Sequence, residues 1–123
     1  MVTKRIMVAE DNDLNRKFFC DVLKANGFEA LPVAEGDQVL DTARRHSPDL
    51  IIMDIQLPGV SGVDLIEAAK KDARLETIPV LAVTAFAAKG DEERIRAAGA
   101  AGYLAKPVSI TPVMSAVKEL LPA

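Results

Sequence analysis

Short apolar runs alternate with amphipathic segments along all 123 residues of the chain. The runs at Ile6–Ala9, Leu50–Met53 and Val80–Val83 are apolar at every position. This pattern is typical of strands that are covered on both faces, as in a parallel sheet between layers of helices. Weaker runs at Glu29–Val33 and Gly102–Ala105 predict two further strands.

The segments between these runs carry apolar residues at helical spacing. In the first segment Leu14, Phe18 and Val22 share one stripe, and either Asn12 or Asp13 can cap its start. Phe18 and Phe19 are adjacent, so we expect one of them to lie in the core and the other at its border. The other helices are predicted from the stripe Val39, Leu40 and Ala43, over Val63–Lys71, over Asp91–Ala98 with Ile95 as its anchor, and from an inward-facing stripe that runs from Ile110 to Leu121.

The regular order of strand and helix predicts an α/β fold with a doubly wound parallel sheet and helices on both faces. Half of the residues are hydrophobic and 27% are charged, which is typical of a folded chain rather than a disordered one. There is no internal repeat, low-complexity tract or linker, so we expect residues 1–123 to form one domain.

Charge and composition exclude several classes of function. The net charge of -3 argues against a protein that coats nucleic acid. The single cysteine, Cys20, excludes a disulfide within the chain, and the single histidine, His46, excludes a metal site built from several histidines. No apolar run is long enough to span a membrane, and the amino terminus does not read as a signal peptide, so we expect a cytoplasmic protein.

Charged and hydroxyl side chains follow four of the predicted strands at the point where each strand ends. They are Glu10 and Asp11, Asp54, Thr84, and Lys106. The carboxyl ends of parallel strands share one edge of the sheet, where open α/β folds bind their ligands, so we expect these side chains to gather there. Two like charges about 4 Å apart repel by about 1 kcal/mol in water and by several times that near a protein surface. A hard divalent cation such as Mg²⁺ would resolve the repulsion between the acids.

Each of these residues also has an ordinary structural interpretation. Glu10 and Asp11 could cap the first helix, Thr84 could be a cap or turn residue, and Lys106 could be a surface lysine. Together they favour phosphoryl chemistry, because Asp54 is a lone acid at the end of a central apolar strand and can become an acyl phosphate. Magnesium, the Lys106 ammonium, the Thr84 hydroxyl and main-chain N–H groups would balance the charge of the incoming group.

Four short motifs occupy these strand ends in the order of the chain. They are Glu10-Asp11-Asn12, the segment Met53–Gly62 around Asp54, Thr84-Ala85 and Lys106-Pro107. As a set they resemble the receiver domain of two-component response regulators, and the resemblance covers the whole chain. It implies a flavodoxin-like fold of five parallel strands in the order 2-1-3-4-5 with five helices. It also implies a signalling role in place of enzymatic turnover.

The resemblance assigns roles to the residues of the site. It implies that Asp54 accepts the phosphoryl group, that Asp11, Asp54 and the main-chain carbonyl of Gln56 hold Mg²⁺, and that Glu10 acts through water. The Lys106–Pro107 bond would be cis, as is usual in the family. The partners implied are a sensor histidine kinase or histidine phosphotransfer protein and other signalling proteins, with no nucleic acid and no membrane insertion.

The resemblance also implies how the signal is read. Ala85 would contact the phosphoryl group through its backbone, and the Thr84 hydroxyl would move toward that group while Tyr103 fills the space behind it. Without the motifs, Tyr103 would be interpreted as a half-buried aromatic with its hydroxyl in water. The partner surface is expected to include Leu14, Asn15, Phe18, Tyr103 and Pro107.

Segments 10–15, 54–58 and 83–96 are similar to single-domain regulators of cell division, which implies a receiver without an output domain and a role in cell-cycle or cell-division control. The alternative function is a magnesium-dependent phospho-aspartyl phosphatase of the haloacid dehalogenase type. Such enzymes use a second acid two residues after the nucleophile, where this chain has Gln56, and an amide cannot transfer that proton.

Overall fold

All five predicted strands are present in the computed structural model, which describes residues 3–85 and 90–121. They are β1 (Arg5–Ala9), β2 (Glu29–Val33), β3 (Leu50–Asp54), β4 (Val80–Thr84) and β5 (Gly102–Ala105). Every neighbouring pair is parallel, and the order across the sheet is β2-β1-β3-β4-β5. The predicted flavodoxin-like topology is confirmed.

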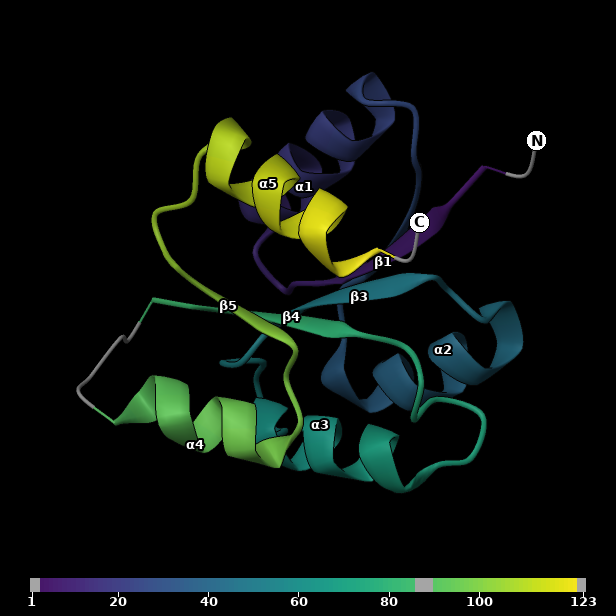
Figure 1. The fold of residues 1–123 in the computed structure, drawn as a ribbon, viewed down its shortest axis with the longest axis vertical. Helices are drawn as coiled ribbons and strands as arrows, with labels where there is room; N and C mark the ends of the chain where they lie inside the picture. The colour runs from purple at the N-terminus through teal and green to yellow at the C-terminus, as the bar shows by residue number, and fades with distance from the viewer. Residues whose placement is uncertain (1–2, 86–89, 122–123) are drawn as a thin grey trace.

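Five α-helices cover the sheet on both faces, as predicted. They are α1 (Asp13–Ala25), α2 (Val39–His46), α3 (Gly62–Lys71), α4 (Asp91–Ala98) and α5 (Ile110–Leu120), with a short 3-10 turn, η1 (Gly36–Gln38), before α2. Figure 1 shows α1 and α5 on one face of the sheet and α2, α3 and α4 on the other. Within the described part of the chain, no helix combines the length and the apolar character needed to cross a membrane.

The core forms two layers because successive residues of each strand point to opposite faces. Met7 and Ile51 face the side of α2, α3 and α4, whereas Ile6 and Ile52 face the side of α1 and α5. The strands β3 and β4 are buried along their whole length, which explains why they are apolar at nearly every position.

The register of the strands brings their carboxyl ends to one edge. Ala9 of β1 pairs with Met53 of β3, so that Glu10 and Asp54 follow at the same level. On the other side Asp54 pairs with Val83, and Thr84 pairs with Ala105. The residues that follow the four strands therefore emerge side by side, as the sequence predicts.

Two apolar residues at the start of helices are exposed. Ile110 was expected to face inward, but it is 56% exposed, whereas the 79% exposure of Leu14 is in keeping with its place on the predicted partner surface. Both residues lie in a first helical turn at the edge of the sheet, where α1 follows β1 and α5 follows β5, so less of the sheet is available to cover them. Phe19 is buried and Phe18 half-buried, as predicted for this pair.

Candidate metal and phosphoacceptor site

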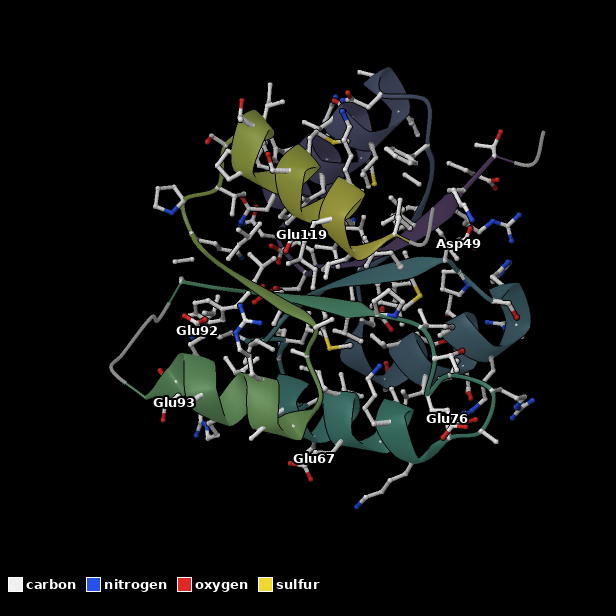
Figure 2. The ribbon with its side chains drawn as sticks, in the orientation of Figure 1. Asp49, Glu67, Glu76, Glu92, Glu93 and Glu119 are labelled. Carbon is white, nitrogen blue, oxygen red and sulfur yellow. The ribbon has the colours of Figure 1, made fainter. Side chains whose placement is uncertain are left out.

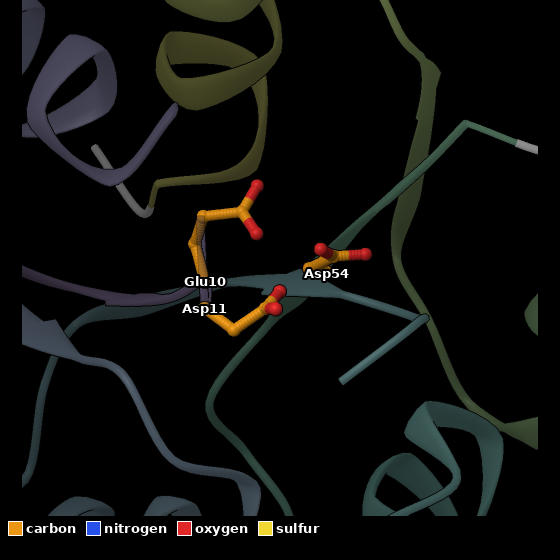
Figure 3. A group of neighbouring side chains, drawn as sticks. All are labelled: Glu10, Asp11 and Asp54. Atoms are coloured by element: carbon orange, nitrogen blue, oxygen red, sulfur yellow. The ribbon is translucent and has the colours of Figure 1, made fainter. Parts of the chain in front are cut away.

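Three carboxylates converge at the carboxyl edge of the sheet. Glu10 and Asp11 come from the loop after β1, Asp54 ends β3, and one oxygen of each lies within 4.8 Å of the other two. Figure 3 shows Glu10 and Asp11 extending toward Asp54. Glu10 and Asp54 are buried, whereas Asp11 is exposed. Among the described residues this is the one group of three or more acids, histidines or cysteines whose ligand atoms lie close enough together to share an ion. Other acids are spread over the outside of the molecule (Figure 2).

Lys106 supplies the positive charge of this cluster. Its Nζ donates hydrogen bonds to Glu10 Oε1 at 2.7 Å and to Asp54 Oδ2 at 3.2 Å. Its backbone N–H donates to the Thr84 carbonyl at 2.8 Å, and the Lys106–Pro107 peptide bond is cis, as the resemblance implies. The lysine thus bridges two acids that lie far from it in the sequence.

The charges shift the pKa values of the three groups. Burial and a hydrogen bond with Asp54 raise the pKa of Glu10 to about 7, although Lys106 opposes the shift. Burial would also raise the pKa of Asp54, but hydrogen bonds from Glu10, the Gln56 N–H and Lys106 hold it below its usual value. Burial disfavours the Lys106 ammonium, but the two carboxylates outweigh this and raise its pKa. The site therefore keeps Asp54 ionised and lets Glu10 hold a proton near neutral pH.

Gln56 connects the loops after β3 and β4. Its backbone N–H donates to Asp54 Oδ1 at 2.9 Å, and its side-chain Oε1 accepts from the Ala85 N–H at 3.3 Å. Thr84 is buried at the end of β4, beside Ala85. Sequence analysis predicted a role for the Gln56 carbonyl but missed the contact of its side chain with Ala85.

The loop after Asp54 folds back tightly against β3. The Gly62 N–H donates to the Ile55 carbonyl at 3.2 Å, and a Cβ at Gly62 would lie only 2.5 Å from the Ile55 Cα. A side chain at position 62 would therefore push against the backbone of Ile55, next to Asp54. Ser61 then caps α3, because its Oγ accepts from the Asp64 N–H at 3.3 Å.

The loop after β1 is held by residues of α1. Asn12 is the N-cap of the two candidates, since its side chain accepts from the Asn15 N–H at 3.0 Å. Arg16 donates from Nη1 to the carbonyls of Glu10 and Asp11. Sequence analysis missed this arginine. The sequence does place an arginine one turn into a helix that begins soon after two acids, and this position could have indicated the contact.

A groove beside the site collects several residues of the predicted partner surface. Asn15 and Phe18 of α1 line it together with Pro107, Val108, Lys106 and Ala85, and its volume is about 450 Å³. The exposed Leu14 lies on the same first turn of α1. Four of the five predicted partner-surface residues thus lie on or close to this groove.

Tyr103 lies apart from that groove. It belongs to β5, where it pairs with Ala82, and its half-buried side chain packs against the core layer under α2, α3 and α4. The groove is on the opposite side, next to α1 and α5. The structure therefore divides the predicted partner surface between the two faces of the sheet.

The residues present fit Mg²⁺. The cluster offers three carboxylates, which are hard oxygen donors, and a single lysine to balance them. Burial and the neighbouring Asp54 disfavour the ionised form of Glu10 and raise its pKa, and a cation beside the two acids would offset part of this cost.

Comparison with known proteins agrees with this geometry. The family model described as "Response regulator receiver domain" matches residues 6–118. The chain belongs to the response regulator receiver domain family. Receiver domains are signalling modules, so the alternative of a haloacid dehalogenase phosphatase is wrong.

Relatives and solved structures of receiver domains cover nearly the whole chain. The polar-differentiation response regulator DivK of Brucella ovis is 50% identical over 120 residues, which is 98% of each chain. The receiver domain of a sensor histidine kinase of Pseudomonas aeruginosa, with a magnesium ion coordinated in its active site cleft, is 29% identical with a TM-score of 0.88, covering 97% of this chain and 98% of that one. A chemotaxis protein of Vibrio cholerae shares the fold at 22% identity, with a TM-score of 0.91, over 98% of this chain and 100% of that one.

Proposed function

We propose that this receiver domain accepts a phosphoryl group on Asp54 from the phosphohistidine of a sensor histidine kinase or histidine phosphotransfer protein. The observation that supports this most is the state of Asp54 itself. It is a buried acid at the end of a central strand, it accepts hydrogen bonds from Lys106 and the Gln56 N–H, and its pKa is lowered. An ionised carboxylate held in this way is a nucleophile with a fixed orientation.

In the proposed transfer an Asp54 oxygen forms a bond to phosphorus while the bond from phosphorus to the histidine nitrogen breaks. The imidazole leaves with the electron pair of that bond. Lys106 stays beside Asp54 and balances the charge that arrives, and we expect the Thr84 hydroxyl and the Ala85 N–H, once it leaves Gln56, to donate to phosphoryl oxygens. Asp11, Asp54 and the Gln56 carbonyl would hold Mg²⁺, with Glu10 acting through water. When bound, the ion supplies further positive charge for the phosphoryl oxygens.

The groove next to the site is the proposed docking surface for the phosphodonor. Asn15, Phe18 and Pro107 line it within reach of Lys106, and Leu14 extends the apolar surface. We propose that the phosphorylated form acts by binding other signalling proteins in the cytoplasm. By similarity to the polar-differentiation regulator DivK, we place this role in cell-cycle or cell-division control.

The test of phosphoacceptance uses a small acyl phosphate or phosphoramidate as donor in the presence of Mg²⁺. Intact-protein mass spectrometry should show one added phosphoryl group on the unmodified chain and none on Asp54→Asn. Asp64→Asn is the matched control, since it removes an exposed acid from the first turn of α3 and should be phosphorylated normally. Phosphorylation of Asp54→Asn would refute the assignment, and repeated hydrolysis of small phosphate esters would contradict the signalling role.

Tyr103 is the proposed switch residue that responds to Thr84. Tyr103→Ala should still be phosphorylated but should lose the phosphorylation-dependent change in affinity for a partner protein. A variant that keeps the full change in affinity would reject the role of this aromatic side chain.

A further inference from the structure

Arg16 has its guanidinium folded back from α1 onto the loop that carries two of the three acids. Nη1 donates to the Glu10 carbonyl at 3.0 Å and to the Asp11 carbonyl at 3.3 Å. Nη2 pairs with Asp13 Oδ1 at 2.5 Å, and only 21% of the arginine side chain is exposed. One side chain therefore holds two consecutive backbone carbonyls of the loop and is itself held by a carboxylate.

These contacts act on the part of the site that regular structure does not fix. Asp54 belongs to a strand, but Glu10 and Asp11 lie between the end of β1 and the start of α1. The negative charge of Asp11 lies close to Asp54 and to Glu10 when Glu10 is ionised, so a free loop would turn Asp11 away when no cation is bound. A guanidinium can hold two carbonyls and a carboxylate at once because it carries several donors in a rigid plane.

The next residue offers a comparison on the same helix. Lys17 is also a cation of the first turns of α1, but it is largely exposed and pairs with Asp21 further along the helix. None of the contacts of Lys17 in the described part of the chain reaches the loop after β1. Both residues carry one positive charge, but only Arg16 contacts the backbone of Glu10 and Asp11.

We propose that Arg16 is a positioning residue of the divalent-cation site, which holds Glu10 and Asp11 in the orientation that binds Mg²⁺. The proposal rests on the proposed function, because it takes Mg²⁺ as the ligand of the three acids. Arg16 touches neither the phosphoryl group nor the cation in this role. It acts through the backbone of the two residues that do the binding.

Arg16 has two opposite effects on the affinity for Mg²⁺, so the direction of the change on its removal shows which effect dominates. Its positive charge repels a cation and lowers the affinity for Mg²⁺, whereas its hold on the loop raises it. If orientation dominates, removal of the guanidinium weakens Mg²⁺ binding, and loss of such an outer contact weakens metal binding by about 10-fold to 100-fold in other sites. If charge dominates, removal strengthens binding.

The experiment measures the affinity for Mg²⁺ by calorimetry at fixed ionic strength, with no phosphodonor present. Arg16→Gln should bind Mg²⁺ about 10-fold more weakly than the unmodified chain. Lys17→Gln removes one positive charge from the same helix and should stay within about 2-fold. Arg16→Lys keeps the charge but cannot hold all three acceptors, so it should remain several-fold weaker. Unchanged or tighter binding by Arg16→Gln overturns the proposal, as does full affinity in Arg16→Lys.

Two further measurements separate positioning from a general loss of structure. In chelator, amide hydrogen exchange of residues 10–12 should be faster in Arg16→Gln, while the strands β3 and β4 keep their protection. If Arg16→Gln does not fold, Asp13→Asn takes its place, because this variant removes one partner of the guanidinium and leaves the arginine present. Asp13→Asn should weaken Mg²⁺ binding by about 2-fold to 5-fold. Unchanged binding by this variant would overturn the proposal. A lack of Mg²⁺ binding by the unmodified chain would instead contradict the proposed function.

Discussion

Glu10 makes the stability of the metal-free protein depend on pH in an unusual direction. Its pKa is raised to about 7 in the folded chain, from an ordinary value of 4.5, because the side chain is buried beside Asp54. The folded state therefore binds this proton more tightly than the unfolded state does. The stabilising contribution is complete below the unfolded pKa and is lost as the pH rises toward and through the folded pKa.

The size of the effect follows from the shift. The raised pKa of Glu10 corresponds to about 3 kcal/mol in the free energy of unfolding at low pH, most of which is lost between about pH 5 and about pH 8. The lowered pKa of Asp54 and the raised pKa of Lys106 act at the acidic and alkaline sides of this window. Glu10 therefore dominates the pH dependence contributed by the cluster near neutrality.

The substitution Glu10→Gln tests this reasoning. The amide can still accept from Lys106 and donate to Asp54, but it does not titrate. The free energy of unfolding is measured by urea titration in chelator, followed by circular dichroism, from about pH 5 to about pH 8. Over this range Glu10→Gln should gain about 2 to 3 kcal/mol in stability relative to the unmodified chain. Asp64→Asn, at an exposed acid of α3 outside the cluster, is the control and should leave the slope nearly unchanged. Equal slopes in Glu10→Gln and the unmodified chain would refute the raised pKa.

Three further predictions concern the loops around the site. Gly62→Ala should lower the free energy of unfolding by about 2 kcal/mol in urea titrations, because the new methyl group meets the backbone of Ile55, and a loss below about 0.5 kcal/mol would contradict the close contact. Asn12→Ala should cost about 1 kcal/mol through loss of the α1 cap, and an unchanged midpoint in the same titration would argue against the cap. Arg44, hydrogen-bonded to Asp72, lowers the pKa of that acid, so its stabilising contribution is present at neutral pH and is lost as the pH falls through the lowered pKa. Asp72→Asn should reduce stability at neutral pH and weaken the loss in acid, and an acid unfolding curve that keeps its shape would contradict this.

Most of the fold could be predicted from the sequence because strands that are buried on both faces have a recognisable apolar pattern. A strand such as β3 that is covered on each side must be apolar at every position, and it ends where the first acid, Asp54, appears. The convergence of Glu10, Asp54 and Lys106 then follows from the parallel topology, although 96 positions separate the lysine from Glu10. Topology brings the three backbone positions together, so that their side chains can meet at the carboxyl edge of the sheet.

The contacts that the sequence did not predict depend on long side chains. Arg16 and Gln56 have several rotatable bonds, so spacing along the chain does not say which backbone group each will reach. The exposure of Ile110 was missed for a different reason. A helical stripe shows which face of a helix points inward, but it does not show where the sheet beneath that face ends.

The contact between Gln56 and Ala85 occupies a hydrogen-bond donor that a free anion beside Asp54 would need. A free anion that approaches Asp54 finds the Ala85 N–H bound to the Gln56 side chain and the Lys106 ammonium bound to two carboxylates. Sulfate or inorganic phosphate would have to break these contacts and would form no covalent bond in exchange. A phosphoryl group attached to Asp54 competes for the same donors at an effective concentration that no dissolved anion reaches. If Asp54 accepts a phosphoryl group as proposed, a pool of free phosphate should not reproduce the phosphorylated state.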